Sequence, residues 1–167
     1  LFLVLLHLLP VLLIPFFVTH DGPSHVYNSF ILNRLLSGDS LTSEFFMLNS
    51  APEPNWTGHF IMMAANQFVP GNVSERIMIG MYIIALPLAF RQLVLVINRQ
   101  AVWASYLVFP FIYSFLLHIG FYNFCIGIPV LFISLDYFIR NRNNLKWKQG
   151  FILSALLVLL YFSHIFL

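Results

Sequence analysis

The chain has 167 residues, of which 60% are apolar and 8% are charged, with a formal net charge of +2. A soluble domain carries about 25% charged residues, and a small soluble fold leaves much of its surface exposed to water. These values exclude a water-soluble globule and indicate a membrane protein. The small net charge gives no basic patch, so no nucleic-acid partner is expected. The single cysteine, Cys125, excludes an internal disulfide.

The apolar runs predict an all-α fold, a polytopic transmembrane helical bundle that forms a single domain over residues 1–167. Because about 20 apolar residues cross the hydrocarbon core, spans are predicted at about 1–19, 77–97, 102–118, 124–139 and 150–167. Pro10 and Pro15 are expected to kink the first span. The chain begins and ends inside apolar runs, so we expect it to be an N-terminal piece of a longer protein.

Residues 20–76 are predicted to form a long first outer loop that carries interfacial helices. Residues 24–37 fit an amphipathic helix that ends at Gly38, and one face of it holds Val26, Tyr27, Phe30, Ile31 and Leu35. Residues 39–56 are expected to lie at the headgroup level. The apolar run 57–69 is too short to cross a bilayer and is expected to be interfacial or re-entrant. The sequence from Asn72 to Glu75 resembles a helix cap.

The basic residues orient this layout, because Lys and Arg favour cytoplasmic loops. If residues 57–69 do not cross, six of the eight basic residues lie at the inner face: Arg91, Arg99, Arg140, Arg142, Lys146 and Lys148. Five of the six acidic residues then lie outside. Five of the six histidines also gather at the outer face: His20, His25, His59, His118 and His164. We therefore expect the chemistry of this protein to occur at the outer face.

The stretch from His20 to Asn28 concentrates polar chemistry directly after the first apolar run. Asp21 is a candidate general base at the mouth of a membrane-embedded site, because a low-dielectric wall tunes a carboxyl pKa. Asp21 also fits the N-cap of a helix that starts at Gly22-Pro23, and one residue can do both. Imidazoles beside a carboxylate can bind a divalent cation, so a metal cofactor is left open.

Several further residues are assigned from their type and position. Arg34 is expected either to meet a lipid phosphate or to snorkel to the interface. Asp136 and Arg140 have the spacing of an i, i+4 ion pair. Asn55-Trp56-Thr57 and Asn72-Val73-Ser74 match glycosylation sequons. The candidate substrate-binding residues are His20, His25, Tyr27, Asn28, Arg34, His59, His118, Tyr122, Asn123 and His164.

Three short motifs and the predicted layout resemble the N-terminal part of GT-C-type integral membrane glycosyltransferases. The motifs are HDGPSHVYN at 20–28, GFYNF at 120–124 and YFSH at 161–164. The resemblance implies a bacterial inner-membrane enzyme that transfers a sugar from a polyprenyl-phosphate donor on the periplasmic or lumenal side. It also implies that Asp21 deprotonates the acceptor. Many members of the family carry a second acid beside the first; here Gly22 follows, so that acid is missing or supplied by Asp39, Glu44 or Glu53.

Two other functions stay open on the sequence. A transporter or flippase-like protein would use the outer-face histidines and Asp21 to bind substrate or to relay protons. An assembly subunit would have no chemistry of its own. Transporters place polar sites near the bilayer midplane, whereas this chain gathers its ionisable groups at one face, which favours the enzyme.

Overall fold

The computed structural model describes residues 1–14 and 16–167, and every regular element in these residues is helical. The elements are α1 (Phe2–Leu13), α2 (Gly22–Leu36), α3 (Ser40–Phe45), α4 (Thr57–Ala65), α5 (Gly71–Ile97), η1 (Arg99–Phe111), α6 (Phe115–Ile119), α7 (Tyr122–Asn141) and α8 (Trp147–Ser163). The predicted all-helical class is confirmed. Pro15, one of the two predicted kink positions, lies outside the described residues.

Among the described residues, three helical segments are long and apolar enough to cross a membrane: Gly71–Ile97, Arg99–Ile119 and Tyr122–Asn141. They match the spans predicted at 77–97, 102–118 and 124–139. α1 is shorter than predicted, because Ile14 precedes a proline and adopts an extended conformation that ends the helix. With 12 residues, α1 is about 18 Å long, whereas a hydrocarbon core is about 30 Å thick. α8 has 17 residues and also ends before its predicted limit.

The segment predicted as one α-helix at 102–118 is instead a 3-10 helix followed by the short helix α6. η1 contains Pro110, which has no N–H to donate and crowds the preceding turn. Ser114 then starts a new helix, and its side chain accepts a hydrogen bond from the Leu117 N–H at 3.4 Å. The break therefore follows from a proline and a capping serine inside an apolar run.

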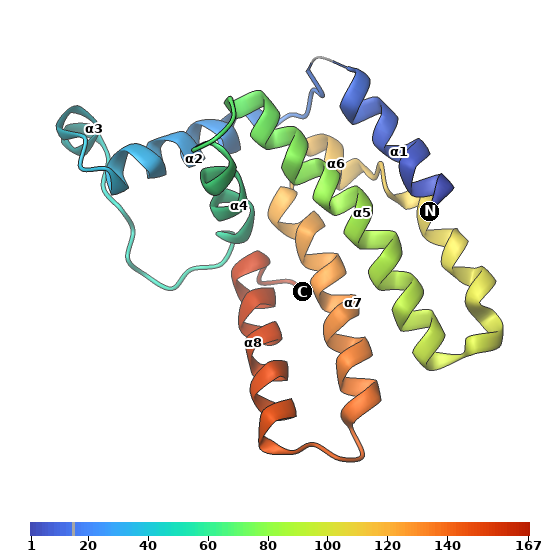
Figure 1. Ribbon diagram of the computed structural model, residues 1–167. Helices are drawn as coiled ribbons and strands as arrows, with labels where there is room; N and C mark the ends of the chain where they lie inside the picture. The colour runs from blue at the N-terminus through green and yellow to red at the C-terminus, as the bar shows by residue number, and fades with distance from the viewer. Residues whose placement is uncertain (15) are drawn as a thin grey trace.

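α5 lies at the centre of the long helices and packs against α1, η1 and α7 (Figure 1). The connections from α5 to η1 and from α7 to α8 lie at one end of the bundle, while α2, α4 and α6 lie at the other. Arg99 begins η1, Arg140 lies in the last turn of α7, and Lys146 caps α8. These three basic residues thus gather at one end, and the assignment of this end to the cytoplasm stays a prediction.

The core joins the long helices to the helices of the 20–76 segment. Its fully buried members include Met62 of α4, Met78, Ile79, Tyr82 and Ile83 of α5, and Tyr122 and Cys125 of α7. Met62 has no exposed surface although α4 has only nine residues. This packing anchors a helix that is too short to cross a bilayer, and it fixes the end of the bundle where the polar residues gather.

The predicted apolar face of α2 is divided, because Val26 packs against the core whereas Tyr27 and Phe30 turn outward. Tyr27 and Phe30 are 53% and 48% exposed, whereas Ser29 is fully buried. The reason is polar: the Ser29 hydroxyl donates to the Val26 carbonyl and accepts from Asn66 Nδ2 at 2.7 Å. α2 therefore packs through a polar contact and turns large apolar side chains outward, which suits a helix at a membrane surface.

The start of α5 also differs from the prediction. α5 begins at Gly71, with Pro70 as the N-cap residue and no side-chain cap. The residues from Asn72 to Glu75 are therefore inside the helix, and Ser74 bonds the Gly71 carbonyl instead of capping. Pro70 has the extended conformation that an N-cap residue adopts, so a proline–glycine pair begins this helix.

We expect a cysteine at position 45 to react with a membrane-impermeant thiol reagent in intact cells, and a cysteine at position 144 to react only after lysis. Both sites are exposed, but they lie at opposite ends of the bundle. The native Cys125 is fully buried and serves as the unreactive background. The reverse labelling pattern would invert the predicted topology.

Candidate functional site

The segment that follows the first apolar run is held against the turn before α7. The His20 N–H donates to the His118 carbonyl at 3.0 Å, and the Asp21 N–H donates to the Ile119 carbonyl at 3.1 Å. Gly120 has a φ of +89°, and a Cβ there would lie 2.9 Å from the Asp21 nitrogen. A residue without a side chain is therefore required at 120, because of both its backbone conformation and the close approach.

A chain of hydrogen bonds ties three helices together beside this pairing. The Gly22 N–H donates to Thr19 Oγ1 at 3.1 Å, and Thr19 Oγ1 lies 2.6 Å from Tyr122 Oη. Tyr122 Oη donates to Glu75 Oε1 at 2.5 Å, so Tyr122 accepts its bond from Thr19. The chain joins the starts of α2, α5 and α7, and it includes a carboxyl group that the sequence assigned to a helix cap.

Gly22 stands where these groups meet. A Cβ on Gly22 would lie 2.7 Å from Tyr122 Oη, and still closer to Thr19 Oγ1 and Glu75 Oε1. The sequence suggested that a second carboxylate had been lost at position 22. The structure shows instead that no side chain fits there without moving the hydrogen-bonded groups.

Asp21 occupies the N-cap position of α2, but its side chain makes no capping hydrogen bond. Thr19 accepts the Gly22 N–H instead. Asp21 Oδ1 is 2.8 Å from His20 Nδ1, and the Asp21 side chain is 44% exposed. Asp21 is the N-cap residue of α2, as predicted. Its side chain makes no hydrogen bond to the helix, however, and instead faces a pocket.

This pocket, which we call the Asp21 pocket, has a volume of about 280 Å³. Its lining residues are Asp21, His25, Asn55, His59, Phe121, Tyr122, Asn123, Phe124 and His164. Asn123 is nearly buried, and its Oδ1 accepts the Gly58 N–H at 2.6 Å. A hydrogen bond from the Trp56 N–H to the Phe162 carbonyl, at 2.8 Å, holds the start of α4 against the end of α8. Residues from both ends of the chain thus meet at one pocket.

Two histidines of the Asp21 pocket contact each other. His25 Nδ1 lies 3.1 Å from His59 Nε2, and His59 Nδ1 lies 3.0 Å from the Asn55 carbonyl. Burial lowers the pKa of both imidazoles. For His25 the neighbouring His59 lowers the pKa further, while a backbone hydrogen bond at Gly120 and the charge of Asp21 act in the opposite direction.

The structure brings together part of the predicted set. The predicted residues that line the Asp21 pocket with Asp21 are His25, His59, Tyr122, Asn123 and His164. The others lie elsewhere. His20 bonds Asp21 but is 83% exposed, and His118 stacks between Phe17 and Tyr113. Tyr27 and Asn28 line two separate grooves on either side of α2.

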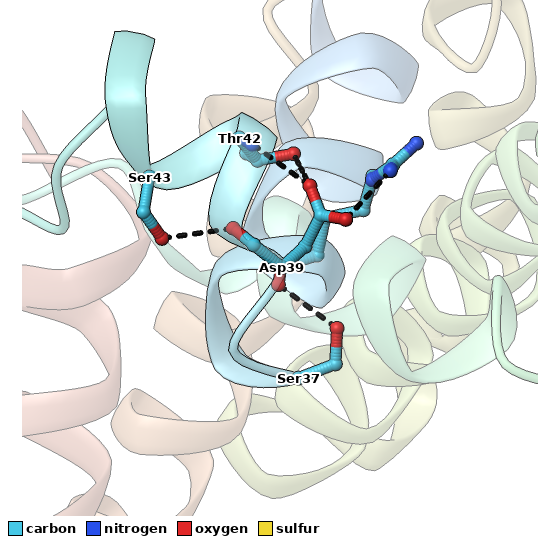
Figure 2. A network of polar contacts seen from close by, with 5 residues as sticks. Ser37, Asp39, Thr42 and Ser43 are labelled. Atoms are coloured by element: carbon cyan, nitrogen blue, oxygen red, sulfur yellow. Dashed lines mark hydrogen bonds and ion pairs between the residues drawn. The ribbon is translucent and has the colours of Figure 1, made fainter.

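Arg34 is paired with an acidic residue of its own loop. Arg34 Nη2 donates to Asp39 Oδ1 at 2.8 Å, and Asp39 Oδ2 accepts from the Thr42 N–H at 2.8 Å and from its hydroxyl at 2.5 Å (Figure 2). Hydrogen bonds from Arg34 and Thr42 hold the pKa of Asp39 well below its usual range. Arg34 thus supports the start of α3, a role that neither sequence alternative included. The predicted pair of Asp136 and Arg140 is confirmed at 2.9 Å.

Sequence reasoning missed Thr19, Asn55 and Glu75. A signal existed for Glu75, because an ionisable residue in a helix of membrane length usually faces the protein interior. No pattern marks Thr19 or the Asn55 carbonyl. Within residues 1–14 and 16–167, no group of three or more His, Cys, Asp or Glu side chains is arranged to hold a metal ion. A divalent cation at His20 and His25 therefore has no support in the described structure.

We expect Gly22→Ala to destabilise the fold by about 1–3 kcal/mol, as overpacking does, because the added methyl overlaps the Thr19–Tyr122–Glu75 chain. Gly150→Ala is the matched control, since its Cβ meets nothing within 4 Å and alanine favours a helix. Thermal unfolding in detergent can be followed with a thiol-reactive dye on the buried Cys125. Equal midpoints for the two variants would contradict this packing.

We expect the free energy of unfolding to fall as the pH drops below about 6.5, the pKa of an unfolded histidine. In the folded protein the pKa of His25 and His59 is lowered, so the unfolded chain binds protons first and acid favours unfolding. At higher pH both histidines are neutral in the folded and the unfolded protein, so they no longer make the free energy of unfolding depend on pH. Unfolding followed by tryptophan fluorescence gives this free energy across pH 5.5–7.5 (about one unit on either side of that pKa). The free energy of unfolding should depend less on pH in the His25→Gln/His59→Gln double variant.

A scan against protein-family models finds no match for this chain, and neither do searches of curated proteins and of solved structures. The comparisons therefore assign no family.

Proposed function

We propose that this protein is an integral membrane glycosyltransferase. It transfers a sugar from a polyprenyl-phosphate donor to an acceptor hydroxyl at the periplasmic or outer face of a bacterial inner membrane. The observation that carries the proposal is the Asp21 carboxylate, which is free of its helix cap and faces a polar pocket. The pocket lies at the end of a bundle that holds three helices of membrane length among its described residues.

For this sugar transfer the protein must mainly hold the donor and the acceptor in the right positions. A glycosyl phosphate already contains a good leaving group, so the enzyme must orient the acceptor and accept its proton. Asp21 Oδ1 is bonded to His20 Nδ1, and we assign proton acceptance to Oδ2. The backbone bonds of His20 and Asp21 to the turn before α7 hold this carboxylate in place. A base with a fixed position is what an acceptor hydroxyl requires.

A groove beside the Asp21 pocket suits the lipid part of the donor. The groove has a volume of about 380 Å³ and runs between α2, α4 and the segment that links α3 to α4. Its walls include Ile31, Leu32, Leu35, Phe46, Met47, Leu48 and Trp56. Asn55 and His59 line both the groove and the pocket. An isoprenoid chain in this groove would bring its phosphate to the His59 side of the Asp21 pocket.

One observation favours the transporter reading as a second candidate. Tyr122 lines the Asp21 pocket and donates to Glu75, which lines a different groove of about 640 Å³ beside α2. The bonded chain of hydroxyls and a carboxyl is the arrangement that relays protons. All these groups lie at one end of the bundle, however, and transporters place such sites near the bilayer midplane. The enzyme remains the better-supported proposal.

We expect Asp21→Asn in the full-length protein to lower transfer of sugar from a polyprenyl-phosphate donor by about 100-fold or more, a typical loss when a general base is removed. Glu44→Gln is the matched control, because Glu44 is exposed on α3 and lines neither pocket nor groove. Transfer is measured in membranes as donor consumption, with protein abundance checked by immunoblot. Full activity of Asp21→Asn would remove Asp21 from the mechanism. Donor-independent proton movement across vesicles would instead support the transporter.

A further inference from the structure

We infer that His25 and His59 together form a phosphate site that is charged by one shared proton, and that this site holds the phosphodiester of the lipid-linked donor. The inference rests on the proposed function and deepens it, because Arg34 was the residue that the sequence offered for a lipid phosphate. Arg34 is paired with Asp39 and does not line the Asp21 pocket. The nitrogen-bearing side chains that line the Asp21 pocket are therefore the candidates for binding a phosphate.

The hydrogen bonds determine where the protons of the pair lie. The Asn55 carbonyl can only accept, so His59 Nδ1 carries a hydrogen. In the neutral pair His59 Nε2 then accepts, and His25 Nδ1 donates to it across 3.1 Å. His25 Nε2 is left as the basic nitrogen, and the hydrogen bond at the Gly120 backbone, which raises the pKa of His25, favours the ring with a proton on that nitrogen.

The same geometry limits the pair to one additional proton. A proton on His25 Nε2 makes His25 an imidazolium and leaves the bond to His59 intact. A further proton on His59 Nε2 would point two N–H groups at each other across 3.1 Å. The pair therefore carries no charge or one positive charge, which is the charge needed to match one phosphodiester.

The ligand and the proton are expected to bind together. The pair is half-buried and its imidazoles resist protonation in the free pocket. An anion against the pair favours the charged form and recruits the proton. The other titratable groups that face the pair or its partners are Asp21, Glu53, Glu75, Tyr122 and His164. Asp21 is the acidic member of the pocket itself, and it disfavours a bare anion there unless the pair is charged.

A second donor supports an anion at this place. Asn123 Oδ1 is committed to the Gly58 N–H, which leaves the Asn123 amide N–H₂ to donate to a ligand. Asn123 lines the Asp21 pocket with both histidines. The groove described above reaches the pocket at His59, so a phosphate in contact with His59 has an apolar path for its chain. Charge, hydrogen-bond donors and chain path therefore coincide at the histidine pair.

The test measures ligand binding without turnover. Full-length protein in phosphatidylcholine nanodiscs is titrated calorimetrically with methyl farnesyl phosphate, a phosphodiester whose single charge does not change between pH 6 and 8 (spanning the ordinary histidine pKa of about 6.5). Buffers with different ionisation enthalpies report the protons taken up. We expect uptake of about one proton per ligand. The affinity should fall by up to about tenfold for each unit by which the pH rises, as linkage to one proton requires.

The variants locate the proton. His25→Gln should abolish the uptake, because His25 Nε2 takes the proton, and His59→Gln should weaken binding of the diester. His7→Gln should change neither, because His7 lies on α1 and bonds its own helix at Leu3. Each variant must keep the unfolding midpoint reported by Cys125. Farnesol, which has the chain without the charge, should bind with no proton uptake. Dimethyl phosphate, which has the charge without the chain, should bind more weakly with the same uptake.

Several results would overturn the inference. Uptake that persists in His25→Gln, uptake with farnesol, or binding of the diester without uptake would each remove the phosphate site. Equal affinity for dimethyl phosphate and the farnesyl diester would assign the site to soluble phosphodiesters instead of the lipid donor. The proposed function fails separately: proton-linked binding without sugar transfer leaves the site standing, whereas Asp21-dependent transfer with unchanged binding in both variants overturns the site alone.

Discussion

The constraint on which this structure depends is the close meeting of Gly22 with Thr19, Tyr122 and Glu75. These residues come from parts of the chain separated by about 50 and 100 positions, and no side chain fits at 22 while their hydrogen bonds are kept. The hydrogen bonds among Thr19, Tyr122 and Glu75 set where α2 starts and the direction in which α2 leaves the bundle. Asp21, the adjacent residue, is thereby placed at a pocket without using its carboxylate for structure. The same contact thus supports the fold and frees the candidate base.

Polar contacts position the helices at this end of the bundle together with the apolar packing of α4. α2 is seated through Ser29 and Asn66, and α4 through Gly58 and Asn123. Tyr27 and Phe30 face outward from α2. In a lipid environment this arrangement is favourable, because an outward apolar side chain loses little and a buried polar pair gains a strong bond. The result is a pocket lined by polar side chains at the end of the bundle where apolar side chains of α2 are exposed.

The division of charge within the candidate site follows from local pairing. Arg34 and Asp39 neutralise each other at the start of α3, so the Arg34 cation is committed to structure. The pocket itself holds histidines whose charge depends on their surroundings. Neutral imidazoles cost less to bury than a permanent cation would.

The sequence by itself determined the class of the fold and the chemistry that gathers at one end of it. Long apolar runs must form helices in lipid, because every backbone group needs a partner within its own segment; α5 and α7 follow directly. The ion pair of Asp136 and Arg140 could also be predicted from the sequence, because a helix sets the distance between residues four positions apart. The tertiary structure alone decided the face of α2, the contact of Thr19 with Tyr122, and the pairing of His25 with His59. Each of these depends on which distant segments meet, and helical periodicity carries no information about contacts across 34 or 103 positions.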